Sequence, residues 1–192
     1  MNSTVPREWE KLYFLNPTKL LVGFRDIAVQ NPLHELPYEV ASLRTHALRK
    51  FGEGRQAALF CYGMSQALGI ETAFALSESR DHDIVVRFYA NNRFNFVPVQ
   101  LKEFVPNFLN EKATLQKELD KLSKYADSTD LVVVFYLNRV TTINLSELNF
   151  PKEKIGELWF FGASDPFQNQ WTLIGNLLKE NALSYNFNYP FI

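Results

Sequence analysis

The sequence is poor in the residues that build disulfides and metal clusters. It holds one cysteine, Cys61, which excludes an internal disulfide framework and a cysteine zinc site and fits a reducing compartment. His34 and His46 have no partner at the spacing of metal ligands. The chain also has no glycine-rich phosphate loop, no nucleophile elbow and no Ser-His-Asp order. It therefore offers no support for a nucleotide-binding loop or a serine-hydrolase site.

Long apolar segments and a strong charge of either sign are absent as well. No window approaches about 18 uninterrupted apolar residues, so we expect no membrane span. The N-terminal stretch lacks the apolar core of a signal peptide, which favours a cytoplasmic location. The formal net charge is −1, so a polyanionic partner would need a local basic face.

Apolar and aromatic residues, by contrast, are plentiful. Of the 192 residues, 46% are hydrophobic and 15% are aromatic, which argues against disorder and for a domain with a full core. Residues 1–51 look helical, with helices expected over Glu8–Leu15, from Pro17 onward, and over Pro37–Phe51. We therefore predict a helical N-terminal extension over residues 1–51 and an α/β domain over residues 52–192.

The stretch from Asp83 to Lys102 predicts two strands folded back on one another. Residues 83–90 and 93–102 are rich in β-branched and aromatic residues, as strands usually are. Asn91 and Asn92 lie between them, and asparagine tolerates the positive φ of a two-residue hairpin turn. We therefore expect a β-hairpin that turns at these two residues.

Polar residues gather at the open end of this predicted hairpin. With the turn at Asn91 and Asn92, Asp83 faces Gln100, and their Cβ atoms would lie about 4.5–5.5 Å apart. Lys102 lies two residues beyond Gln100 and so points to the same face. A carboxylate, an amide and a lysine at one end of an otherwise apolar pair of strands suggest a functional site.

The segments on either side of the hairpin predict a mixed sheet with helices. One helix is expected to begin at Gly52-Glu53-Gly54 and to end at Gly69, before a strand over Ile70–Leu76. After the hairpin, Asn110 is expected to cap another helix. The run Leu131–Leu137 has no alternation, which is typical of a parallel strand covered on both faces.

The C-terminal part is expected to hold a strand, a helix and an aromatic tail. The strand is predicted over Glu157–Gly162 and the helix over Trp171–Lys179. The tail alternates Tyr185, Phe187 and Tyr189, which is typical of an edge strand or of an arm that clamps a surface. This C-terminal aromatic tail, or an edge strand, could mediate a homodimer.

This order of elements and polar residues resembles the PD-(D/E)XK nuclease superfamily, which includes restriction endonucleases and Holliday-junction resolvases. In that superfamily, an acidic residue near the first helix, an Asp on the second strand and an (E/Q)-x-K motif on the third form the metal site. Glu53, Asp83 and Gln100-Leu101-Lys102 match these positions. The resemblance covers about residues 52–137. It implies a three-layer α/β/α fold with a mixed central sheet, the restriction-endonuclease-like αβββαβ core.

The resemblance also implies a metal-dependent DNA endonuclease that hydrolyses phosphodiester bonds with Mg²⁺ or Mn²⁺. Asp83 would supply a carboxylate oxygen, Gln100 its amide oxygen and Leu101 its backbone carbonyl, and Mg²⁺ prefers such oxygen ligands. Lys102 would hold or deprotonate the attacking water. Glu53 would orient a metal-bound water or bind a second ion.

Two residues depart from the usual pattern of the superfamily. His82 takes the place of the proline before the aspartate. Gln100 is the rarer variant at its position and removes one negative charge, so metal should bind weakly. Glu39, on the preceding predicted helix, is an alternative to Glu53 as the helical acid.

Other interpretations of the same residues stay open. Arg80, Arg87 and Arg93 surround the hairpin and could contact phosphates, or they could be half-buried strand residues with solvated heads. Asp83 and Lys102 could merely pair across the strand ends. The whole chain could also be a non-catalytic α/β binding module, for protein or DNA, that keeps the nuclease fold without the reaction.

Overall fold

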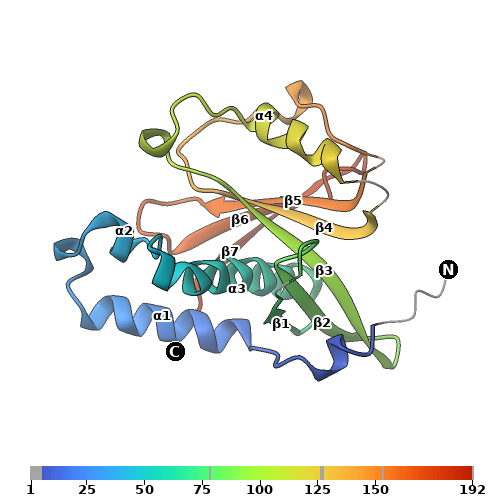
Figure 1. The fold of residues 1–192 in the computed structure, drawn as a ribbon, viewed down its shortest axis with the longest axis horizontal. Helices are drawn as coiled ribbons and strands as arrows, with labels where there is room; N and C mark the ends of the chain where they lie inside the picture. Colours follow the sequence, from blue (N-terminus) through green and yellow to red (C-terminus); the bar gives the residue numbers. More distant parts are fainter. Residues whose placement is uncertain (1–5, 78, 126–127, 153, 192) are drawn as a thin grey trace. The chain divides into compact units, whose positions relative to one another are not determined.

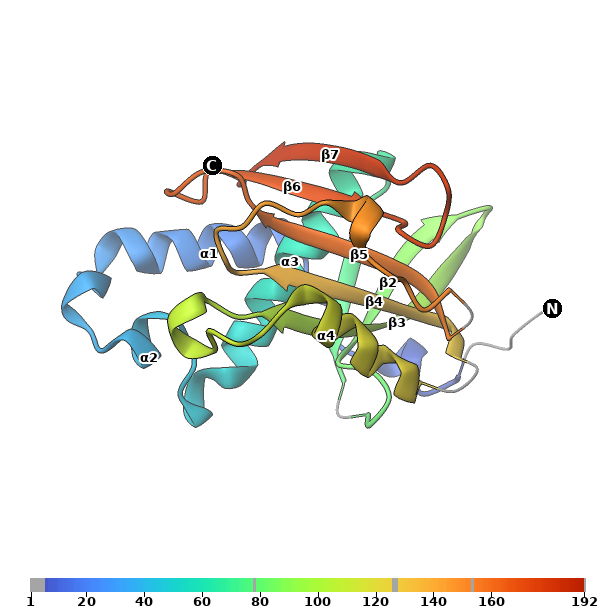
Figure 2. The same ribbon diagram turned by 90° about the horizontal axis from the view of Figure 1, so that it is seen from above.

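The fold is α/β with a mixed sheet, as the sequence predicts. A computed structural model describes residues 6–77, 79–125, 128–152 and 154–191. They contain a sheet of seven strands whose order follows the chain (Figure 1, Figure 2). The chain divides into two compact units. The described residues of the first unit are 6–77, 79–96 and 189–191, and those of the second lie within 97–188.

The first unit combines helices with the beginning of the sheet. Its helices are α1 (Pro17–Gln30), α2 (Tyr38–Ala41) and α3 (Arg49–Leu68). Its strands are β1 (Thr72–Leu76), β2 (Ile84–Ala90) and residues 93–96 of β3 (Arg93–Phe104). Helix α1 packs against α3, α3 packs against β1, and β1 pairs antiparallel with β2. Leu21, Leu59 and Phe74, one from each of α1, α3 and β1, are fully buried in its core.

The segment before α1 is less helical than predicted. The helix expected over Glu8–Leu15 is wrong, because this segment contains only a 3₁₀ turn at Trp9–Lys11. The end of the segment is extended instead. Leu15 and Phe74 of β1 exchange backbone hydrogen bonds of 2.7 and 3.1 Å, which a helical Leu15 could not make.

The helix boundaries before β1 also differ from the prediction. The helix expected over Pro37–Phe51 is reduced to α2, and Leu43 then adopts a positive φ of 59°, which an α-helix does not allow. The break predicted at Gly52–Gly54 is wrong, because α3 begins at Arg49 and runs through it. A Cβ on Gly52 would lie 3.2 Å from the Leu43 carbonyl oxygen, so glycine here provides space. The domain boundary at residue 51 stays a prediction.

The β2–β3 hairpin turns where the sequence predicts. Asn91 and Asn92 have φ angles of 54° and 58°, as a two-residue hairpin turn requires. The Asn95 side-chain amide donates to the carbonyl oxygens of Ala90 and Arg93, at 3.1 and 3.2 Å, and so fixes the turn from one side.

The second unit carries the parallel part of the sheet. After β3 come β4 (Ser128–Leu137), β5 (Ile155–Ala163), β6 (Gln170–Gly175) and β7 (Leu183–Asn188). Strands β3, β4 and β5 are parallel, whereas β6 and β7 continue antiparallel. Helix α4 (Leu115–Asp120) and the 3₁₀ turn after it cover one face of these strands. The core there contains Leu115, Leu119, Leu122, Val133, Phe135, Leu158 and Phe160.

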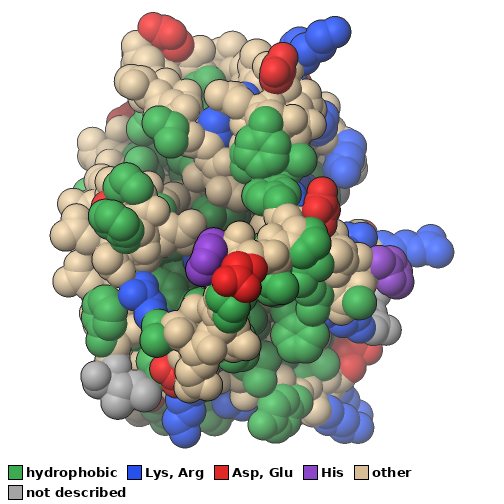
Figure 3. All heavy atoms as spheres, turned by 90° about the vertical axis from the view of Figure 1, so that its left-hand side faces the viewer, with side chains coloured by type: hydrophobic (Ala, Val, Ile, Leu, Met, Phe, Trp, Pro, Cys, Tyr) green, Lys and Arg blue, Asp and Glu red, His purple; other side chains and the backbone are tan. Residues whose placement is uncertain are grey.

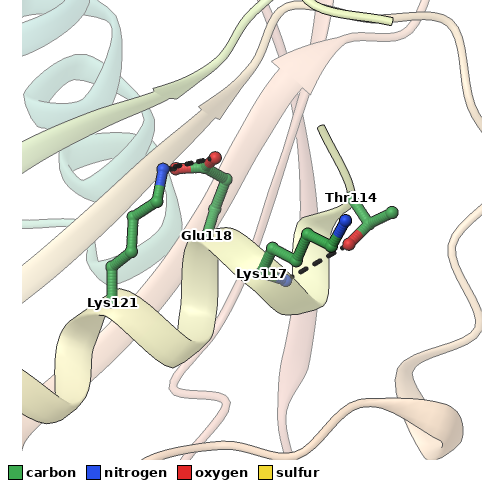
Figure 4. Close-up of polar contacts among 4 residues, drawn as sticks. All are labelled: Thr114, Lys117, Glu118 and Lys121. Carbon is green, nitrogen blue, oxygen red and sulfur yellow. Dashed lines mark hydrogen bonds and ion pairs between the residues drawn. The ribbon is translucent and has the colours of Figure 1, made fainter. Parts of the chain in front are cut away.

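Two predicted features of the second unit are wrong. Helix α4 is capped by Thr114 and not by Asn110: the Thr114 hydroxyl accepts from the Lys117 backbone N–H at 3.3 Å (Figure 4). The helix expected over Trp171–Lys179 does not form, because residues 170–175 are strand β6, in which buried and less buried residues alternate, and a turn follows. The predicted parallel strand over Leu131–Leu137 and the edge strand in the tail are both confirmed, as β4 and β7. No helix of the described residues is long and apolar enough to cross a membrane.

Candidate functional site

Strand β3 sets the direction of the predicted motif residues. Gln100 and Lys102 lie two positions apart in one regular strand, so they point to the same face of the sheet. Their partners in β4 are Val133 and Phe135, which belong to the core beneath α4. Gln100 and Lys102 therefore face the α4 side of the sheet, and Leu101 points to the other side.

The Gln100 side chain is buried. It is only 7% exposed, and its amide nitrogen lies 3.5 Å from the backbone carbonyl oxygen of Leu101. Lys102, two residues on, is half-buried. A buried amide normally satisfies its donors and acceptors, and no buried side-chain polar atom of the described residues lacks a hydrogen-bond partner. Of the two polar motif residues in β3, Gln100 is therefore buried and Lys102 is only half-buried.

Asp83 directly precedes β2, and its backbone is held in place. The Ser77 N–H donates to the Asp83 carbonyl oxygen at 2.8 Å, which closes the loop between β1 and β2. The side chain of Asp83 is half-buried. Its predicted pairing with Gln100 stays a prediction.

His82, which departs from the family pattern, supports this loop. Its ring is buried, its Nε2 lies 3.1 Å from the Ser77 hydroxyl oxygen, and it packs edge-on against Trp9 at 5.5 Å between centroids. Burial lowers the pKa of His82, against the opposing effect of the carboxylates of Asp81, Asp83 and Glu8. His82 therefore fills space next to Asp83. Sequence reasoning missed Trp9 and Ser77 because neither belongs to a motif.

The two candidate helical acids have different surroundings. Glu53 lies inside α3, and its Oε1 accepts from the Arg49 Nε at 2.9 Å, one helical turn earlier. The expectation that it starts the helix is wrong, since α3 begins at Arg49. Glu39 lies in α2 and is exposed. Glu53 is the better fixed of the two.

The three predicted arginines have different environments. Arg80 is exposed in the loop before β2, and Arg93 is exposed at the start of β3. Arg87 is half-buried, and its guanidinium stacks on Phe14 and Phe94. The face of the molecule in Figure 3 has basic and acidic side chains interspersed with hydrophobic ones, so neither sign of charge dominates it.

The predicted ligands have oxygen atoms of the kind that a hard cation takes. Asp83 has a carboxylate, whereas Gln100 and Leu101 offer neutral amide and carbonyl oxygens, and Mg²⁺ binds all of these types. Among the residues that the structure describes, no three His, Cys, Asp or Glu side chains gather as a metal cluster.

Arg139 is a prominent polar residue that the sequence did not single out. Its guanidinium donates to the carbonyl oxygens of Val105, Asn110 and Ala113, at 2.9, 2.7 and 3.1 Å, and stacks on Phe104. These bonds tie the segment between β3 and α4 to the end of β4. We assign Arg139 a structural role.

Comparison with known proteins adds no family to this description. No protein-family model, no curated protein and no solved structure matches the chain. The class that fold and residues define is an α/β protein with a mixed sheet.

Proposed function

We propose that the chain is a metal-dependent nuclease that hydrolyses phosphodiester bonds in DNA. The observation that carries the proposal is the order α3, β1, β2, β3, α4, β4, with β3 and β4 parallel. This is the αβββαβ order that the resemblance implies. Asp83 precedes the second of these strands and Gln100-Leu101-Lys102 lies in the third. We include in the proposal the three-layer α/β/α arrangement of restriction endonucleases.

Each residue has a role that its chemistry suits. Asp83, Gln100 and the Leu101 carbonyl would hold Mg²⁺ or Mn²⁺, which when bound stabilises negative charge on the phosphate oxygens. The Lys102 ammonium, a compact point charge, would hold the attacking water and lower the energy of the hydroxide formed from it. Glu53 would orient a further water through its free carboxylate oxygen lone pairs.

The first test is cleavage of supercoiled plasmid with Mg²⁺, with Mn²⁺ and with EDTA. We expect metal-dependent nicking that Lys102→Ala reduces at least about 100-fold, the usual range for a residue that handles the proton of a nucleophile. The matched control is Lys112→Ala, which removes an exposed lysine from the segment before α4. Unchanged nicking by pure Lys102→Ala protein would refute the role of Lys102.

The second test measures metal binding by calorimetry. Asp83→Ala should abolish Mn²⁺ binding, and Asp81→Ala, which removes an exposed carboxylate two residues earlier, should not. Gln100→Glu should tighten binding, because it adds a second carboxylate to the donor set. Undiminished binding by Asp83→Ala would place the metal elsewhere.

A second candidate function is a binding module without catalysis. The buried, neutral Gln100 and the net charge of −1 favour it, because both weaken the attraction for a metal and for DNA. Inactivity of the wild-type protein with every divalent metal and with several forms of DNA would select this alternative.

A further inference from the structure

The β2–β3 hairpin carries an aromatic surface next to its turn. Tyr89 and Phe94 are 56% and 55% exposed, and their rings meet edge-to-face at 5.3 Å between centroids. Phe14 and Phe96 extend the group, 5.9 Å apart. Single exposed aromatic residues are normal on protein surfaces, but a contiguous group of them usually marks a binding surface.

A positive charge lies inside this aromatic group. The Arg87 guanidinium carbon is 4.3 Å from the ring centroid of Phe14 and 4.9 Å from that of Phe94. These are cation–π contacts, and they hold the Phe94 ring while its outer side stays in solvent. The surface is therefore both aromatic and cationic.

The turn beside this surface is well fixed. Asn91 and Asn92 supply the two positive φ angles, and the Asn95 side chain bonds two carbonyl oxygens of the turn. A preformed surface loses little conformational entropy when it binds a ligand.

The charge of the hairpin favours an anionic ligand. Residues 84–98 include Arg87 and Arg93 and have no Asp or Glu, whereas the whole chain has a net charge of −1. Alternation along β3 directs Arg93 to the face opposite Phe94, so Arg93 adds to the local potential and takes no part in stacking. The hairpin thus has a local excess of positive charge, although its two arginines lie on opposite faces, and such an excess attracts a polyanion.

We propose that Phe14, Arg87, Tyr89 and Phe94, together called the stacking surface, bind unpaired bases of single-stranded nucleic acid. Exposed rings on which bases stack, with arginine beside them, are the features by which proteins bind single strands without reading sequence. If the bound strand is the substrate, the inference rests on the proposed nuclease function. It implies a substrate with an unpaired segment next to the bond that is cut.

The spacing along β2 indicates where that segment would lie. Tyr89 is six residues from Asp83, or roughly 20 Å at about 3.3 Å per residue. A stacked strand covers this length in roughly six nucleotides, at about 3.4 Å each. The unpaired bases on the stacking surface would therefore lie about six nucleotides from the cleaved bond.

Fluorescence anisotropy with labelled oligonucleotides in EDTA tests the stacking surface without cleavage. The probes are an oligothymidine, an abasic strand with the same number of phosphates, the matched duplex, and an oligouridine that separates DNA from RNA. Phe94→Ala should raise the Kd for oligothymidine by about 5- to 100-fold, the usual loss for one stacked base. The matched control is Phe167→Ala, at a ring 82% exposed between β5 and β6, which should leave the Kd unchanged.

The abasic strand and two further variants separate stacking from simple loss of fold. Wild type and Phe94→Ala should bind the abasic strand equally, because it offers phosphates but no bases. Phe94→Trp keeps a ring and should retain affinity, whereas Phe94→Leu keeps apolar bulk alone and should behave like Phe94→Ala. Thermal melts identify any variant that fails to fold. Among the folded variants, a lower Kd for Phe94→Trp than for Phe94→Leu shows that the ring itself binds the bases.

Several results would overturn the inference. The wild-type protein could bind no single strand, or Phe94→Ala and Phe167→Ala could have the same Kd for oligothymidine. Phe94→Ala could also lose as much affinity for the abasic strand as for oligothymidine. Sedimentation showing a dimer that Phe94→Ala dissociates, with no effect on oligothymidine, would assign the surface to a second copy of the chain. Because binding is measured without metal, absence of plasmid nicking would refute the nuclease proposal and leave this result standing.

Discussion

Tyr189 connects the C-terminal part of the described chain to helix α1 through one hydroxyl group. The residue is buried, and its hydroxyl donates to the carbonyl oxygen of Leu21 in α1 at 2.8 Å. The Arg25 guanidinium covers its ring at 4.4 Å and lies 4.9 Å from Phe191. The sequence predicted an edge strand or a clamping arm in this tail, and Tyr189 directly follows strand β7. The sequence could not identify the partner, because Leu21 offers a backbone atom that every residue has.

Removal of this hydroxyl should destabilise the protein. In Tyr189→Phe the buried carbonyl of Leu21 loses its side-chain donor, and we expect the free energy of unfolding to fall by about 1 kcal/mol. Urea unfolding followed by circular dichroism measures the change. Tyr13→Phe removes a hydroxyl from a ring that is 84% exposed and should have no effect. An equal loss in both variants would contradict the prediction.

The same residue should make stability depend on alkaline pH. Burial raises the pKa of Tyr189 above its usual value near 10.0, against the opposing effect of Arg55 and Arg25. The folded state therefore favours the neutral phenol. The resulting stability is fully present below the pKa of the unfolded chain and is lost as the pH rises through the folded pKa. Urea midpoints from pH 8 to pH 11 should fall less steeply in Tyr189→Phe than in wild type.

At the scale of helices and strands, two glycines should respond to alanine in opposite directions. Gly23 lies inside α1 with no atom within 4 Å of a Cβ built there, so Gly23→Ala should stabilise by about 0.5–1 kcal/mol through helix propensity. A Cβ on Gly175 of β6 would collide with the ring of Trp159, so Gly175→Ala should destabilise by about 1–3 kcal/mol. Thermal and urea unfolding of both variants provide the test. A stabilised Gly175→Ala would disprove the packing argument.

The accuracy of sequence prediction varied among the elements for a physical reason. The β2–β3 hairpin and β4 were predicted because their signals are local: two asparagines at a turn, and an unbroken apolar run. Strand β6 was mistaken for a helix because its apolar residues fit both periods over a short length. Pairing with β5 and β7 decides its structure, and that pairing is not local.

The candidate site was predictable in part for the same reason. Strand alternation alone puts Gln100 and Lys102 on one face of β3. The contact of Arg87 with Phe14 was not predictable, because Phe14 lies far away in the sequence and carries no motif. The support that Trp9 gives to His82 was missed likewise.

For the whole molecule, the near-zero net charge limits how nucleic acid can bind. Attraction should come from a few local cations, and Arg80, Arg87 and Arg93 are the candidates. A plot of the logarithm of the binding constant for a single strand against the logarithm of the salt concentration should have a slope of about −2. Each neutralised phosphate contributes about −0.7 to this slope, and the three arginines would neutralise three phosphates. Arg93→Gln should reduce the slope by about 0.7, and Lys112→Gln should not. Anisotropy titrations at four salt concentrations measure it.

The division of the chain has a consequence for its synthesis. The second unit is one continuous segment, but the first includes residues on both sides of it. On the ribosome, α1, which ends at Gln30, must therefore wait for Tyr189 while roughly 160 residues are added, about 8–32 s at about 5–20 residues per second. During that interval the nascent chain can complete the later unit before the earlier one. The growing polypeptide would then expose the incomplete surface of α1 to chaperones.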